Sequence, residues 1–300
     1  MPAADVVVGV PLVRRLIADQ FASLVGEPVR LLANGWDNFS FRVGSHLVAR
    51  LPRREVSATL IDHEARWLPR LAPLLPLPVP APIHLGRPGH GYPWNWVIAP
   101  WIDGSPVSGE VEPDAAADDL GAFLDALHQP APHDAPSNPY RGIPLRDRDE
   151  STRSRIADLA DRVDSERLLD LWEAALSSPA HQGPSIWLHG DLHPLNLLAE
   201  AGRLSGVIDF GDITSGDPAT DLAVAWMIFD RPARSRFRSA YGKADDDTWE
   251  RARGWAVSLA TSYLAHSADS PPMADIGTAT LQRLTAGDES GLESASEGPD

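Results

Sequence analysis

The sequence predicts an α+β fold with two lobes, a small, mainly antiparallel β lobe with one inserted helix and a larger, mostly helical lobe. Short alternating segments separated by turn residues dominate the early part of the chain, and apolar residues at helical spacing dominate the later part. Prolines crowd residues 69–82, which indicates an extended connector. We expect the first lobe to span residues 1–103 and the second residues 104–285.

In the first lobe, the apolar pattern alternates between the periods of helix and strand. Gly44 and Ser45 separate two alternating segments and are typical of a hairpin turn, whereas Pro69 should kink or end the helix that contains it. The expected elements are a helix over 12–25, strands over 29–33, 39–44 and 46–51, a helix over 57–72 and a buried strand over 95–102.

The second lobe is helical on both sides of one strand-rich stretch. Ala201 and Gly202 indicate a hairpin within that stretch. Residues 286–300 contain five acids and no basic residue, and we expect this tail to be disordered. The expected elements are a helix over 114–128, one or two helices within 151–178, strands over 185–189, 196–200 and 203–210, and helices over 218–229, 233–242, 247–266 and 273–285.

The composition excludes several classes of function. The 300 residues contain no cysteine, so disulfides, zinc–thiolate sites and cysteine nucleophiles are excluded. The net charge is −16 with Lys243 as the only lysine, which disfavours nucleic acid and anionic membranes and would attract small cations. Such a charge also suits a protein that is simply soluble, so it identifies no partner. No apolar run approaches the roughly 20 residues of a membrane helix, and the N-terminus lacks a basic secretory start, so we expect a cytoplasmic protein.

One stretch, IWLHGDLHPLNLL (residues 186–198), places polar side chains between two apolar runs. A strand–loop–strand–turn–strand unit brings its two ends together, so Asp191, Asn196 and the later Asp209 are expected to converge. Two carboxylates and an amide oxygen form an oxygen-only cluster, which suits Mg²⁺. Incomplete protein ligation leaves room for phosphate oxygens, so the cluster indicates a phosphoryl-transfer site.

The motif HGDLHPLN followed by VIDFGD resembles the aminoglycoside phosphotransferase and choline kinase-like branch of the protein-kinase-like fold. The resemblance covers residues 25–270 and implies a bilobal kinase-like fold. It implies that Asp191 is the catalytic residue and that Asn196 and Asp209 hold Mg²⁺. Within GDPATDLA, Asp221 would brace the catalytic loop from a buried helix.

The same resemblance implies a nucleotide site in the first lobe. The strand HLVARLPR places Arg50 where this fold usually carries a lysine for the nucleotide phosphates, and Glu64 would pair with it from the next helix. The segment VIAPWIDG matches the hinge, where Pro100 offers a backbone carbonyl and Ile102 a backbone amide to the base. The short loop NGWDNFS replaces a glycine-rich loop and makes Ser40 a candidate phosphate contact.

The resemblance implies Mg²⁺-dependent transfer of the γ-phosphoryl group of ATP or GTP to a hydroxyl of a small molecule. An aminoglycoside or macrolide antibiotic is the leading acceptor, because the acidic chain would favour its amines. A metabolic kinase for choline, a sugar or homoserine remains an alternative, as does a non-catalytic kinase-like nucleotide-binding protein. The tetrapeptide GDLH also occurs in two-metal phosphoesterases, but their other Asp-x-His and Gly-Asn-His ligands are missing here.

Overall fold

The computed structural model describes residues 3–107 and 111–286, so all but the first residue of the expected acidic tail lies outside the described residues. A five-stranded antiparallel sheet in the order β1-β2-β3-β5-β4 forms one end of the molecule. The sheet and its two helices have these bounds: α1 (Val10–Gln20), β1 (Val29–Asn34), β2 (Asn38–Val43), β3 (Leu47–Pro52), α2 (Glu55–Leu71), β4 (His84–Gly86) and β5 (Trp96–Pro100).

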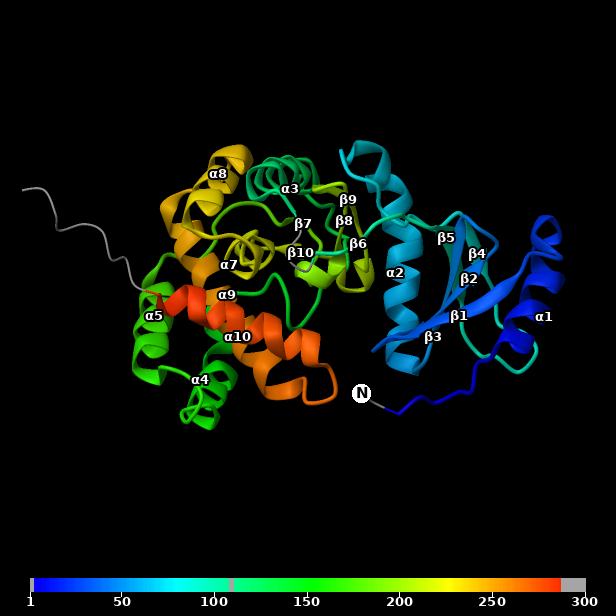
Figure 1. Cartoon of the computed structure of the whole chain (residues 1–300), viewed down its shortest axis with the longest axis horizontal. Helices are drawn as coiled ribbons and strands as arrows, with labels where there is room; N and C mark the ends of the chain where they lie inside the picture. The colour runs from blue at the N-terminus through cyan, green and yellow to red at the C-terminus, as the bar shows by residue number, and fades with distance from the viewer. Residues whose placement is uncertain (1–2, 108–110, 287–300) are drawn as a thin grey trace, which may run out of the picture.

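The two helices cover opposite sides of this sheet, as Figure 1 shows. Leu16 of α1 packs against Phe41 and Trp96 in one buried hydrophobic cluster. Trp67 and Leu71 of α2 belong instead to the cluster that fills the helical part of the molecule. The inserted helix therefore joins the sheet to the helical region, because it contacts β3 and β5 while Trp67 and Leu71 pack into the helical cluster.

Strand–turn units and helices make up the rest of the described chain (Figure 1). α9 lies at its centre and contacts α4, α5, α6, α7 and α10. The elements are β6 (Ser105–Pro106), α3 (Pro113–Leu127), α4 (Asp149–Asp158), α5 (Ser165–Ser177), β7 (Ile186–Leu188), β8 (Leu197–Glu200), β9 (Arg203–Val207), β10 (Thr214–Gly216), α6 (Ala219–Leu222), α7 (Val224–Ile228), α8 (Arg231–Tyr241), α9 (Asp246–His266) and α10 (Pro271–Thr285).

The predicted α+β class is confirmed, and four local differences have physical causes. α1 ends at Gln20 because residues 22–24 form a separate 3₁₀ turn. Pro69 lies inside α2, within its last turn, where its missing N–H removes a single bond. The strand β4 was not expected, because three residues are too few to show alternation. The helix expected over 218–229 is broken at Ala223, whose carbonyl accepts from Trp226 in a tight i→i−3 bond.

No helix in residues 3–107 and 111–286 is both long and apolar enough to cross a membrane. The division of the chain at residue 103 stays a prediction. One hydrophobic cluster crosses that boundary, because α2 precedes residue 103 and yet packs into the cluster of the helical region.

Candidate active site

The predicted catalytic loop begins where β7 ends and runs to Asn196. Gly190 has φ +87°, and a Cβ at this position would lie 2.3 Å from the carbonyl oxygen of Asp212. A side chain here would therefore clash with backbone, and only glycine allows the close approach. This contact brings the loop against the turn that follows Asp209.

A buried aspartate braces this loop. Asp221 of α6 accepts hydrogen bonds from the backbone N–H of His189 at 2.7 Å and of Gly190 at 2.9 Å. Its Oδ2 also lies 3.2 Å from Nε2 of buried His128. Burial would raise the pKa of Asp221, but the hydrogen bond and charge of His128 outweigh it and hold this pKa below its usual value. The bracing contact predicted for Asp221 is confirmed.

The carboxylate of Asp191 is held by three side chains from different parts of the chain. Oδ1 lies 3.0 Å from Nη2 of Arg141 and 3.4 Å from the hydroxyl of Tyr263, and Oδ2 lies 3.5 Å from Nε2 of His193. Burial works to raise the pKa of Asp191, yet the hydrogen bond of His193 and the charge of Arg141 hold it well below its usual value. Asp191 is therefore ionised at neutral pH.

Asn196 and Asp209 lie beside the same loop. The amide nitrogen of Asn196 donates to the backbone oxygen of Asp191 at 2.9 Å, and the backbone oxygen of Asn196 accepts from the N–H of Ile208 at 2.9 Å. These bonds place Asp209 next to the loop. Asp209 takes a left-handed conformation with φ +63°, which ends the strand expected to reach residue 210. Its side chain is 58% exposed, so its oxygens remain accessible.

The oxygen atoms of Asn196 and Asp209 are suitable ligands for Mg²⁺. Within the described residues, no hydrogen bond uses the amide oxygen of Asn196, and the Asp209 carboxylate has one free edge beyond its contact with Arg50. Both are hard oxygen ligands. In this part of the chain, no group of three or more His, Asp or Glu residues gathers as a metal cluster. A bound Mg²⁺ would therefore take its other ligands from nucleotide phosphates and water.

Arg50 connects the sheet to Asp209. Its Nη1 lies 2.6 Å from both carboxylate oxygens of Glu64, which is fully buried, and its Nη2 lies 2.9 Å from Oδ1 of Asp209. Burial would lower the pKa of Arg50, but the two carboxylates raise it above its usual value. The predicted pairing of Arg50 with Glu64 is confirmed as a contact.

A cavity of about 320 Å³ separates the sheet from the strand pair β8–β9. Ser40 faces it beside Arg50, its cross-strand neighbour, and the segment after β5 closes it on the other side. Its walls include five predicted site residues, namely Ser40, Arg50, Pro100, Ile102 and Asp209. The side chains of Leu32, Val48, Leu198 and Ile208 add apolar surface suited to a planar ring. The structure therefore gathers these residues around one space, and their roles stay predictions.

Sequence patterns missed the second layer of residues around Asp191. Arg141 comes from a loop, Tyr263 from α9, and Asn138 donates to Asp212 at 2.6 Å. Burial and the charge of Asp191 raise the pKa of Asp212 to about 6. Asn138, Arg141 and Tyr263 belong to no local motif, because they come from segments distant in sequence, whereas Asp212 is the last residue of the VIDFGD motif.

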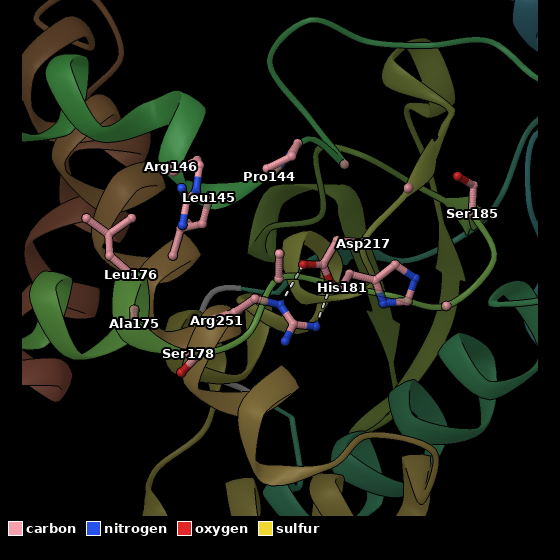
Figure 2. A pocket seen from close by; sticks show the side chains of 14 residues that line it. Pro144, Leu145, Arg146, Ala175, Leu176, Ser178, His181, Ser185, Asp217 and Arg251 are labelled. Carbon is pink, nitrogen blue, oxygen red and sulfur yellow. Dashed lines mark hydrogen bonds and ion pairs between the residues drawn. The ribbon is translucent and has the colours of Figure 1, made fainter.

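A second cavity, of about 220 Å³, holds none of the predicted site residues (Figure 2). Figure 2 shows Arg251 paired with Asp217 on its wall, with a shortest N–O distance of 2.7 Å, and both residues are buried. Arg146 and His181 also line this space. Because Arg251 and Asp217 neutralise each other, this pair is best explained as a structural link between α9 and the start of α6.

Comparisons with known proteins agree with this geometry. The model of the phosphotransferase enzyme family matches residues 28–255. The viomycin phosphotransferase of Streptomyces vinaceus is 33% identical over 109 residues, 34% of this chain and 38% of that protein. An aminoglycoside 3'-phosphotransferase of Escherichia coli is 27% identical over 164 residues, 51% of this chain and 60% of that protein. These matches span only 38% to 60% of the curated relatives' own lengths.

Solved structures extend the similarity in fold over nearly the whole chain. The GDP complex of wild-type aminoglycoside 2'-phosphotransferase-IIIa superposes with a TM-score of 0.66 at 20% identity, covering 91% of this chain and 97% of that one. Macrolide 2'-phosphotransferase type I gives a TM-score of 0.64 at 21% identity, covering 92% and 98%. At these identities the likeness shows the fold alone.

The antiparallel sheet, the inserted helix paired to it through Arg50, and the braced loop before Asp209 define a kinase-like fold of the phosphotransferase type. The chain belongs to the phosphotransferase enzyme family. This confirms the resemblance found in the sequence.

Proposed function

We propose that the protein transfers the γ-phosphoryl group of ATP or GTP to a hydroxyl of a small molecule in a Mg²⁺-dependent reaction. One observation carries the proposal. Asn196 contacts Asp191 and Arg50 contacts Asp209, and a backbone hydrogen bond from Ile208 to Asn196 links the two pairs beside the cavity that Arg50 and Asp209 line. That combination supplies a proton acceptor, metal ligands and a phosphate-binding charge in one place.

In the proposed reaction, the acceptor hydroxyl oxygen forms a bond to the γ-phosphorus while the bond from this phosphorus to the β–γ bridging oxygen breaks. The nucleoside diphosphate leaves with the electron pair of that bond. The hydroxyl proton passes to the carboxylate of Asp191, which Arg141 and His193 keep ionised. Mg²⁺ held by Asn196 and Asp209 would neutralise charge on the phosphates.

The cavity supports a nucleotide site for the donor. Arg50 and Ser40 would meet the phosphates, because they lie side by side on the wall nearest Asp209. In the described part of the chain, the backbone N–H of Ile102 donates to no protein group, so it is free to bind the base. The carbonyl of Pro100 would accept from the base on the same edge. ATP and GTP both satisfy this arrangement.

The names of the relatives make antibiotics the first acceptors to test, among them aminoglycosides, macrolides and viomycin. A specific observation favours the second candidate, a metabolic kinase. The side chains nearest Asp191 include arginine, whereas an acceptor rich in amines would call for acids at this point. The third alternative, a non-catalytic protein, would bind the nucleotide but would transfer no phosphoryl group to any acceptor.

The test is a transfer assay with γ-labelled ATP or GTP, with and without Mg²⁺, against antibiotics and hydroxylated metabolites. Asp191→Ala is the matched control, because it removes the proton acceptor and leaves the nucleotide cavity unchanged. We expect label in one acceptor with wild type and Mg²⁺ and loss of that label in the control. Tight Mg²⁺-nucleotide binding with no transfer to any acceptor would favour the non-catalytic alternative.

A further inference from the structure

Three arginines lie close to one another near Asp191, in a protein whose net charge is −16. Arg141 contacts the Asp191 carboxylate directly at 3.0 Å. Arg148 ends the 3₁₀ turn before α4, and Arg155 follows two turns later in that helix. We call Arg141, Arg148 and Arg155 the arginine cluster. Its local charge is opposite in sign to the charge of the whole chain.

Arg148 is the first of two members of the arginine cluster whose charge is not compensated. In the described residues, it forms no ion pair, and its buried Nε has no hydrogen-bond partner. Its guanidinium lies 5.7 Å from the ring centroid of Tyr140, whose side chain is 60% exposed, so the cluster reaches the surface here. Burial and the charge of Arg141 lower the pKa of Arg148. A half-buried cation with an unused donor is a site that an anion can satisfy.

Arg155 adds a second uncompensated charge. It is buried, and within residues 3–107 and 111–286 it donates only to neutral groups, the hydroxyls of Thr152, Ser258 and Thr261 and the backbone oxygen of Ser258. Burial, with the charges of Arg148 and Arg141, lowers its pKa to about 10. Arg155 therefore remains charged at neutral pH and adds positive potential behind Arg148.

Acids near the cluster do not cancel this charge. Asp191 is matched by Arg141. Asp212 lies close to both, and its pKa of about 6 leaves it mostly ionised at pH 7, so it offsets one positive charge. Asp149, next to Arg148 in sequence, contacts Arg153 and Trp172 instead. Among these residues, the two guanidinium groups of Arg148 and Arg155 are therefore offset by one carboxylate. Burying unpaired charge is costly, so a ligand that supplies the missing anion would recover that cost.

On the basis of the proposed phosphotransferase function, we infer that the acceptor carries an anionic group, a carboxylate or a phosphate, which binds at Arg148 and Arg141 while its hydroxyl faces Asp191. The potential of Arg155 strengthens this site. An acceptor whose only charges are amines would meet like charge at the same place. The net charge of the chain would attract small cations, but it does not describe the field beside Asp191, where near charges dominate.

Isothermal titration with four related six-carbon probes tests this inference: gluconate, glucose 6-phosphate, glucose and glucosamine. A non-hydrolysable ATP or GTP analogue and Mg²⁺ are kept saturating, so that the nucleotide phosphate site is filled. We expect wild type to bind gluconate or glucose 6-phosphate more tightly than glucose and to bind glucosamine least. The two anionic probes separate a carboxylate site from a phosphate site.

Arg148→Glu should weaken binding of the preferred anion about tenfold, since one attractive charge becomes repulsive. Arg146→Glu is the matched control. It makes the same charge change in the same 3₁₀ turn, but Arg146 is exposed and lines the separate cavity of Figure 2. Its affinity should stay within about twofold of wild type. Arg148→Gln, which removes charge without adding any, provides a second variant if Arg148→Glu does not fold.

Three outcomes overturn the inference: tightest binding of glucosamine, no measurable binding of either anionic probe to wild type, or equal losses in the Arg148 and Arg146 variants. The same titration also reports Mg²⁺-nucleotide binding. Loss of that binding would count against the proposed function itself, whereas intact nucleotide binding with a preference for glucosamine overturns only the charge assigned to the acceptor.

Discussion

Arg50 and Asp209 are 159 positions apart in the chain and form an ion pair with an Nη2–Oδ1 distance of 2.9 Å. The same guanidinium also holds Glu64 on α2. One side chain thus links the sheet, the inserted helix and the predicted metal ligand. Because Glu64 is fully buried, Arg50 supplies the charge that makes this carboxylate tolerable inside the protein.

The first prediction concerns this linked group. Arg50→Ala should lower the free energy of unfolding by roughly 3–5 kcal/mol, because it leaves a buried carboxylate unpaired. Arg50→Lys keeps the positive charge but loses the planar guanidinium that contacts two carboxylates at once, so it should retain part of the activity. Urea unfolding of Arg50→Ala, Glu64→Ala and the double variant measures the coupling. Losses that simply add in the double variant would show that the two residues act independently.

Asp191→Ala should reduce phosphate transfer by roughly 10²–10⁴-fold, because it removes the carboxylate proposed to take the hydroxyl proton. Nucleotide affinity should change little, since Asp191 lies outside the cavity that Arg50 and Ile102 line. Transfer rate and nucleotide binding are measured on the same preparation. Near-normal transfer in this variant would remove Asp191 from the mechanism.

Asp209→Ala should weaken Mg²⁺-dependent nucleotide binding more than Asn196→Ala does. A carboxylate neutralises charge at the metal, whereas an amide oxygen only coordinates it. Nucleotide is titrated with Mg²⁺ and with EDTA for each variant. If Asp209→Ala keeps the full Mg²⁺ dependence of wild type, the assignment of Asp209 as a metal ligand is wrong.

The raised pKa of Asp212 predicts how the free energy of unfolding changes with pH. Its pKa of about 6 in the folded protein lies above the ordinary aspartate pKa of 3.8, so between these pH values the folded protein binds more protons than the unfolded chain. The contribution of Asp212 to stability therefore decreases as pH rises through this window. Asp212→Asn should reduce the fall in unfolding free energy between pH 4.5 and pH 7, whereas the exposed Asp147→Asn should not. Identical pH profiles for both variants would contradict the assignment.

Asp221→Ala should cost roughly 3–5 kcal/mol of stability, because it leaves two loop N–H groups and His128 without their buried acceptor. Transfer should fall as well, since the loop that carries Asp191 would lose its brace. Thermal unfolding and transfer rate are compared with Asp230→Ala, which removes only the N-cap of α8. A loss no larger than that of the cap variant would show that the loop is held by other contacts.

Local sequence patterns predicted the fold class, and the resemblance of two short motifs identified the family. The hairpin at Gly44 and Ser45, the strand pair around Ala201 and Gly202, and the helices of the second lobe follow from turn residues and apolar periodicity, which act over a few residues. The spacing of Asp191, Asn196 and Asp209 belongs to one short strand–loop–strand unit. Its geometry depends mainly on near neighbours, so the sequence by itself was enough to locate it.

Only the tertiary structure decided what surrounds Asp191. Arg141 and Tyr263 reach it from a loop and a distant helix, and no sequence spacing encodes that meeting. The arginine cluster likewise depends on the tertiary fold, which brings Arg148 and Arg155 close to Arg141. Electrostatic effects fall with distance in space rather than along the chain. The net charge of −16, read from the sequence, therefore could not reveal that the predicted acceptor side is locally positive.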